Sequence, residues 1–224
     1  MKPIIYLILF MLLPGIILAQ EDRIYTTSSG ELIFSFASVD YAGDEEGAIM
    51  RFSPVVNIQN WLNYDKSEKL GFFTGLSLRN VGFIYDVDET TRKKYRTYNV
   101  GIPVGVKFGN LSDKFLFFGY ELEIPVHYKE KTFVDEDKED KDGYWFTSRV
   151  PTINHSLMAG VQLPYGATLK FKYYLTNFFD EDFTASDGQG GTYKPFEDYN
   201  VNIFYVSLSF GLLKDLNFYY NEED

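Results

Sequence analysis

Apolar and polar positions alternate with a period of two over most of the chain, and hardly any stretch repeats at the 3.6-residue spacing of a helix. The alternating segments are rich in Phe, Tyr, Val and Ile, which favour strands. The pattern therefore predicts an all-β protein with eight strands, over residues 31–39, 48–62, 70–86, 95–108, 114–128, 150–163, 166–178 and 199–212.

The lengths of these segments favour a membrane barrel. Strands of soluble proteins average ~5 to 6 residues, whereas a tilted membrane-spanning strand needs ~9 to 11. Long and short connections also alternate, as they do between the extracellular and periplasmic ends of outer-membrane barrels. The long connections are 40–47, 87–94, 129–149 and 179–198, and the short ones are 63–69, 109–113 and 164–165. We therefore expect an eight-stranded antiparallel up-and-down transmembrane β-barrel.

Aromatic residues gather near the predicted strand ends, where membrane barrels carry girdles of rings. Rings in an aromatic-rich β protein also lie near strand ends without a membrane, so the pattern supports the barrel without deciding it. The candidates are Trp61, Tyr64, Phe108, Phe115 and Tyr165 near the short turns, and Tyr41, Tyr85, Tyr95, Tyr128, Tyr144, Trp145, Phe178 and Phe179 near the long loops.

One face of each predicted strand is apolar, and the other carries most of the charge. Within 95–108, for example, Val100 and Ile102 share a face opposite Asn99 and Lys107. If the apolar faces meet lipid, the opposite faces fill a barrel too narrow for a pore, and buried charges there must pair. We expect a filled polar interior centred on Glu121 and Glu123, formed by Arg51, Arg79, Lys107, Glu121, Glu123, Lys170 and Lys172. The inverse arrangement, a secreted soluble barrel with its apolar faces inward, stays open at this stage.

Composition narrows the function classes. The formal net charge of -11 excludes a nonspecific nucleic-acid binder, and the absence of Cys excludes disulfides, thiolate metal sites and a cysteine nucleophile. Residues 1–19 carry Lys2 as their only charge, then an apolar run that ends at Ala19, which predicts a cleaved signal peptide. Residues 20–224 are then one barrel domain, exported to the outer membrane.

Two segments carry a resemblance to a known family. YNVGIPVGVKFGN, at 98–110, and YELEIPVHYKE, at 120–130, each place Ile-Pro before an alternating apolar run. Over about residues 24–220 the chain resembles the small outer-membrane β-barrel family of Bacteroidetes that includes PorT-type proteins. The resemblance implies an eight-stranded outer-membrane barrel, in a family whose members are assigned to secretion or envelope upkeep. The C-terminus departs from such barrels, because the last strand does not end the chain on an aromatic residue.

The two histidines are the only candidates for a histidine-based general base or metal ligand. Strand parity places His127 on the face of Glu121 and Glu123, and His155 on the apolar face, so they are not expected to form one site. No serine is fixed beside His127. We expect no catalytic activity, no cofactor and no metal centre.

The stretch 135–142 holds six acidic residues and two lysines but lacks the glycine and terminal glutamate of an EF-hand loop. It is predicted to be a solvated loop. A sharper hypothesis makes it a contact for divalent cations, surface glycolipid or a partner, through Asp135, Glu136, Asp137, Glu139, Asp140, Asp142 and Trp145. The glycines of 187–191 precede no Gly-Lys-Ser/Thr, so they predict a mobile loop rather than a phosphate loop.

The sequence thus predicts a structural or interaction role in the cell envelope, with outer-membrane lipid, surface glycolipid and an envelope protein complex as candidate partners. The alternatives are a component of a protein-secretion or outer-membrane assembly complex, and, further off, a narrow channel or a lipid-modifying enzyme.

Overall fold

The computed structural model describes residues 23–47, 49–135, 137–211 and 216–217. The predicted signal peptide at 1–19, like Glu136, lies outside the described residues. Among the residues that the structure describes, no helix is long and apolar enough to cross a membrane. The strands are β1 (Arg23–Tyr41), β2 (Asp44–Gly47), β3 (Arg51–Ser53), β4 (Ile58–Asp65), β5 (Leu70–Asp86), β6 (Thr91–Asn110), β7 (Lys114–Val134), β8 (Asp137–Trp145), β9 (Asn154–Gln162), β10 (Thr168–Tyr174), β11 (Ala185–Ser186), β12 (Thr192–Tyr193), β13 (Tyr199–Gly211) and β14 (Leu216–Asn217), with a short 3-10 turn at Pro164–Gly166.

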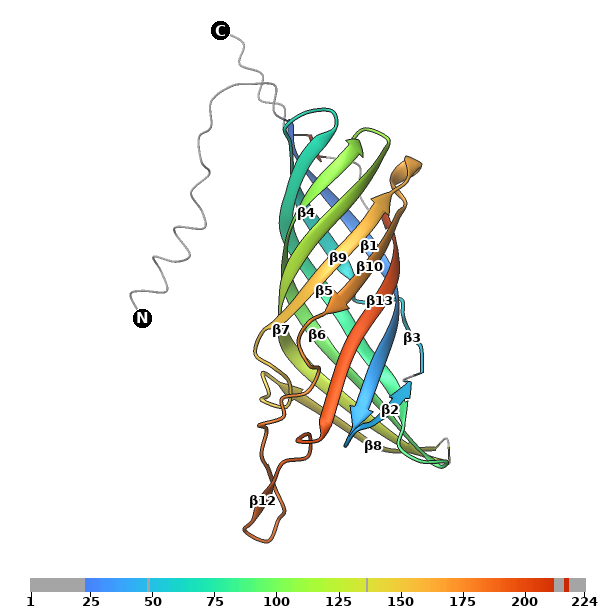
Figure 1. Cartoon of the computed structure of the whole chain (residues 1–224), viewed down its shortest axis with the longest axis vertical. Coiled ribbons are helices and arrows are strands. Elements are labelled where there is room, and N and C mark those ends of the chain that lie inside the picture. Colours follow the sequence, from blue (N-terminus) through green and yellow to red (C-terminus); the bar gives the residue numbers. More distant parts are fainter. Residues whose placement is uncertain (1–22, 48, 136, 212–215, 218–224) are drawn as a thin grey trace, which may run out of the picture.

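Eight antiparallel strands form a closed ring in the order β1, β4, β5, β6, β7, β9, β10 and β13, and pairing of β13 with β1 completes it (Figure 1). The closing ladder runs from Ser29 opposite Gly211 to Tyr41 opposite Tyr199. The predicted eight-stranded antiparallel barrel is therefore confirmed.

The strand bounds differ from the sequence prediction: β1 begins at Arg23 instead of residue 31, β9 and β10 are shorter than the predicted strands 150–163 and 166–178, and β6 and β7 are longer at one barrel end. β6 begins at Thr91 and β7 continues to Val134, so the connection 87–94 reduces to a turn at 87–90. The predicted loop 129–149 is largely strand, because β8 pairs with the end of β7. Conversely, the predicted strand 48–62 is interrupted between β3 and β4, where Pro54 has no N–H to donate to a ladder.

The connections 66–69, 111–113 and 163–167 lie together at the end that is uppermost in Figure 1, and β2, β8 and β12 lie at the opposite end. The predicted separation of short turns from long connections is thus confirmed apart from the tight turn at 87–90. We call these the turn end and the loop end.

The apolar faces of the strands point outward. On β6 the outward side chains from Tyr98 to Phe108 span about 34 Å along the strand, or roughly 26 Å along the barrel axis at a tilt of ~40°. That height matches the apolar band of membrane barrels, about 25 Å. The soluble alternative with inward apolar faces is therefore wrong. Large exposed residues of this outer face include Leu62, Leu76, Val100, Ile102, Val104, Leu116, Phe118, Leu122, Ile124, Leu157, Leu169, Phe171, Leu208 and Phe210.

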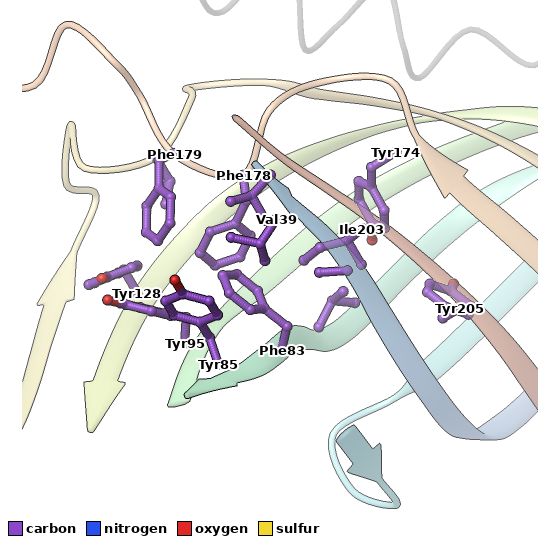
Figure 2. Close-up of a cluster of buried hydrophobic side chains, with 14 of the residues drawn as sticks. Val39, Phe83, Tyr85, Tyr95, Tyr128, Tyr174, Phe178, Phe179, Ile203 and Tyr205 are labelled. Atoms are coloured by element: carbon purple, nitrogen blue, oxygen red, sulfur yellow. The ribbon is translucent and has the colours of Figure 1, made fainter. Parts of the chain in front are cut away.

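The interior is filled, and it contains apolar layers as well as the predicted charges. At the loop end, Phe178 and Phe179 enter the barrel mouth and pack against Phe83 and Tyr95 (Figure 2). We call this buried group the mouth cluster; its members include Val39, Val81, Phe83, Tyr85, Tyr95, Tyr128, Tyr174, Phe178, Phe179, Phe196, Ile203 and Tyr205.

Nearer the turn end, Trp61, Phe73, Phe117 and Met158 form a second apolar layer inside the barrel, here called the Trp61 layer or ring layer. Trp61 stacks on Phe73 at 4.2 Å between ring centroids and meets Phe117 edge-on at 5.2 Å. Several rings that the sequence assigns to the girdles are therefore interior, namely Trp61, Tyr85, Tyr95, Tyr128, Phe178 and Phe179.

Glycines make room for this ring layer. A Cβ at Gly160 would overlap the ring of Phe117 and lie 2.7 Å from the carbonyl oxygen of Leu169, and a Cβ at Gly105 would overlap the ring of Phe73. The rings cannot retreat, because Trp61 packs against both. These interior glycines therefore allow an eight-stranded barrel to hold three large rings at one level.

We expect Gly160→Ala to destabilise the barrel by about 1 to 3 kcal/mol, because the added methyl overpacks a filled layer. Urea unfolding in detergent micelles, followed by loss of the fast-migrating band in unboiled gel samples, measures the change. Gly211→Ala is the matched control, since nothing lies within 4 Å of its Cβ position. Equal stability of the two variants would contradict the account of this layer.

Candidate functional site

Charged side chains meet in the middle of the barrel, between the two apolar layers. Lys172 Nζ donates to Glu121 Oε2 at 2.5 Å and to Glu123 Oε1, so one ammonium bridges both carboxylates. Arg79 Nη1 lies 3.1 Å from Glu121 Oε1. These side chains come from β5, β7 and β10 and are 0 % exposed.

A second carboxylate centre adjoins the first. Lys170 pairs with Glu31, and Arg79 Nε lies 3.4 Å from Glu31 Oε2. The central network thus sets three cations, Arg79, Lys170 and Lys172, against three carboxylates, Glu31, Glu121 and Glu123. This balance matters because an unpaired charge in a dry interior costs several kcal/mol.

Neutral groups form further hydrogen bonds with the charged side chains of the network. Tyr174 Oη donates to Glu123 Oε2 at 2.7 Å, and Asn99 Nδ2 donates to the same oxygen at 2.8 Å. Arg79 Nε donates to Tyr205 Oη at 2.8 Å, and Gln59 Oε1 accepts from Lys170 at 3.1 Å. These bonds hold the charged groups in one arrangement.

Two of the residues predicted for this network lie elsewhere. Lys107 is buried beyond the ring layer, near the turn end, where its Nζ lies 2.6 Å from Asp65 Oδ1 and 3.0 Å from Asn63 Oδ1. Arg51 is also buried, but its Nη2 donates to Asn80 Oδ1 at 2.6 Å, away from Glu121. The structure therefore brings together five of the seven predicted residues: Arg79, Glu121, Glu123, Lys170 and Lys172.

Sequence reasoning missed Glu31 and Asp65, which supply the acids that the predicted set lacked. Glu31 shares the strand face of Ile33 and Ser35, so the alternation of β1 already placed it inside. Asp65 ends β4, where the sequence pattern predicts a turn.

Buried apolar side chains lie on both sides of the charge network: the mouth cluster lies towards the loop end and the Trp61 layer towards the turn end. Within the mouth cluster, a cavity of about 10 Å³ is bordered by Asn99, Tyr174 and Phe178 and has room for roughly one water molecule. Asn99 Oδ1, buried without a described partner, is an acceptor for it.

His127 faces outward, which corrects the prediction that it shares the face of Glu121 and Glu123. The pairing of β6 with β7 changes register between Tyr98 and Asn99, so β7 carries one extra residue beside Pro125. Because Pro125 has no N–H, a bulge there loses little, and it reverses strand parity beyond it. The ring of His127 accordingly lies between those of Tyr98 and Trp145, tilted against both, with centroids 5.6 and 4.5 Å away.

His155, as predicted, lies on the outer apolar face, where its Nδ1 hydrogen-bonds to the hydroxyl of Tyr120. The partner of His155 across the ladder is Leu122, five residues before His127 along β7. The two histidines therefore lie about 17 Å apart along the strand and share no site.

The predicted acidic loop is a strand, and its alternation separates the charges. Asp140 and Asp142 face the side of Thr132 and Glu130, whereas Lys141 pairs with Lys131 on the opposite face. Among the described residues, no group of three or more His, Asp or Glu side chains gathers as metal ligands. The candidate contacts Asp135, Asp137, Glu139 and Asp140 are exposed along β8 or its turn, Asp142 is partly buried, and Trp145 is 69 % exposed at the end of β8.

The glycine-rich stretch forms a tight turn between β11 and β12. Asp187 Oδ1 accepts hydrogen bonds from the N–H groups of Gln189 and Gly191, both at 2.8 Å. Two backbone N–H groups of this stretch are thus used within the turn itself.

Comparisons with known proteins place the chain near small barrels of solved structure. No family model matches the sequence, and no curated protein matches it significantly. Ail, the attachment invasion locus protein of Yersinia pestis, solved with the heparin analogue sucrose octasulfate, shares 11 % identity and a TM-score of 0.37, over 86 % of this chain and 100 % of Ail.

Two further structures are similar at the same level. Neisserial surface protein A has 10 % identity and a TM-score of 0.37, over 85 % of this chain and 99 % of its own. CarO of Acinetobacter baumannii has 9 % identity and a TM-score of 0.39, over 84 % and 97 %. At these values the likenesses transfer no function, and the proposals below rest on the geometry of the chain itself.

We expect Lys172→Met to destabilise the barrel by about 3 to 5 kcal/mol, because it leaves two carboxylates buried with one cation fewer. Urea unfolding in detergent micelles measures the loss. Lys194→Met, which removes an exposed pair with Asp182, is the matched control and should change stability far less. Adding Glu123→Gln to Lys172→Met should cost less than the sum of the single changes; strict additivity would contradict coupling through the shared ammonium.

Proposed function

We propose that the chain is an outer-membrane β-barrel with a structural or interaction role in the cell envelope. The observation that carries the proposal is the division of side chains: apolar residues cover the outer face over roughly 26 Å, while paired charges and rings fill the inside. In this proposal the turn end faces the periplasm and the loop end faces outward, since outer-membrane barrels keep their short turns on the periplasmic side.

The closed interior argues for a role at the surface of the barrel rather than through it. A conducting pore needs a continuous water column, which the mouth cluster and the Trp61 layer interrupt. An enzymatic role would need a nucleophile and a base within reach of each other, and His127 and His155 lie apart on the outer face. The residues left to interact with other molecules are those of the loop end.

A second candidate is a component of a protein-secretion or outer-membrane assembly complex, as the PorT-like resemblance implies. The observation that favours it is the hairpin of β7 and β8, which extends the sheet at the loop end. Among the described residues β8 pairs only with β7, and Phe146, which follows it, is 75 % exposed. An unpaired strand edge beside an exposed ring is a surface on which another chain can dock.

The membrane assignment predicts that lipid contacts Trp145. In vesicles of brominated phosphatidylcholine, we expect quenching of tryptophan emission that is strongest when the bromines lie near the glycerol end of the chains, because Trp145 marks the interface. The only other tryptophan, Trp61, is 5 % exposed inside the barrel, so Trp145→Phe should abolish most of the quenching. If brominated lipid does not quench the tryptophan emission, the membrane assignment is wrong.

The first and second candidates differ in what accompanies the protein out of the membrane. Extraction from native outer membranes in a mild detergent should give the barrel without a stoichiometric partner if its role is that of an independent envelope component. A partner recovered in equal amount, and lost when Phe146→Ala removes the exposed ring, would establish the second candidate in place of the first.

A further inference from the structure

A row of cations crosses the outward face of the loop end. Lys94 on β6 stands opposite Lys131 on β7, which stands opposite Lys141 on β8. In the neighbouring row Arg96 stands opposite Lys129. Like charges directly opposite each other across strands are destabilising, so three lysines in register are a cost that the fold itself does not require.

None of these five cations forms an ion pair with any residue that the structure describes. Acidic neighbours in the sequence lie on the other face, where Glu130 pairs with Lys93 at 3.0 Å. The positive charge of this face is therefore uncompensated.

The position of these cations relative to the apolar band indicates what compensates them. Along the outward face of β6 the order is Ile102, Val100, Tyr98, Arg96 and Lys94, so apolar residues give way to a ring and then to cations. On β7 and β8, His127 and Trp145 occupy the same level as Tyr98. Membrane proteins place aromatic side chains at this boundary, and the next level contains lipid headgroups.

We propose that Lys94, Arg96, Lys129, Lys131 and Lys141, here called the basic face, bind the phosphate groups of anionic lipids in the leaflet around the loop end. This proposal rests on the membrane assignment made above and names the partner of the loop end. It replaces a metal-bridged contact through the acids of 135–142 with direct contact between cations and phosphate. The cations on β6 and β7 lie on the same outward face as the apolar residues that contact lipid. A lipid of the surrounding leaflet can therefore reach them without another protein.

The experiment uses the full-length barrel in vesicles that contain phosphatidylcholine and a minor fraction of phosphatidylglycerol, with bromine on only one of the two lipids. On β8, Gly143 is the partner of Lys129, and Trp145 lies two residues further along on the same side of the strand. The quenching of Trp145 therefore reports which lipid lies next to the basic face. We expect brominated phosphatidylglycerol to quench Trp145 well beyond its share of the mixture. Lys94→Gln, Lys129→Gln and Lys131→Gln together should reduce that enrichment by about tenfold.

Lys66→Gln with Lys69→Gln is the matched control, because it removes two exposed lysines at the turn end and should leave the enrichment unchanged. Added salt should weaken the enrichment. Equal quenching by both lipids, or enrichment that survives the triple substitution, would overturn the basic face as a lipid site while leaving the membrane assignment intact. Release of the lipid by millimolar inorganic phosphate, or binding of a soluble sulfated polysaccharide without lipid enrichment, would overturn it as well. Absence of quenching by either lipid would instead refute the membrane assignment.

Discussion

Closure of the strand ring by the pairing of β1 with β13 is the constraint on which the rest of this structure depends. Closure satisfies the backbone hydrogen bonds of the outermost strands, which would otherwise present edges. It also separates every strand into an inner and an outer face. With eight strands the inner space is only as wide as its side chains, so each interior residue must fit and each interior charge must find a partner.

The charge network is the consequence of that confinement. Glu121 and Glu123 lie on one face of β7, two residues apart, and their mutual repulsion is offset by Lys172 between them and by Arg79 beside Glu121. Apolar layers on both sides keep water from solvating the ions, which strengthens each pairing and raises the cost of losing one. The network is therefore part of the barrel's packing.

At the loop end the bulge beside Pro125 decides which charged residues of β7 face outward and which face inward. The extra residue beside Pro125 shifts the pairing of β7 with β6, so that Lys129 and Lys131 face outward and Tyr128 and Glu130 face inward. Without the bulge the lysines would point toward the mouth cluster and the ring of Tyr128 toward lipid. The pairing of β8 then places Lys141 beside Lys131, which concentrates cations directly above the apolar band. An acidic protein thereby presents a basic surface at the level of lipid headgroups.

The sequence by itself determined the class of fold, the number of barrel strands, and the faces of the strand centres. It could do so because a strand has a period of two, and the apolar faces repeat that period without interruption around Glu121 and Glu123. The same alternation also puts Glu31, Trp61 and Phe117 on the inner faces of their strands. The ion pairs and ring contacts that these residues form nevertheless depend on strands distant in sequence.

Only the tertiary structure decided the rest. The bulge at Pro125 changes no residue pattern within β7, yet it reverses the facing of His127 and of every residue after it, because facing beyond a bulge depends on the register with β6. The sequence predicts a loop for the acidic stretch because its residues have low strand propensity. In the structure the stretch forms β8, because the extended end of β7 pairs with it. Side chains of Lys94, Lys131 and Lys141, far apart in the chain, meet in one row for the same reason: strand pairing, not local sequence, sets their neighbours.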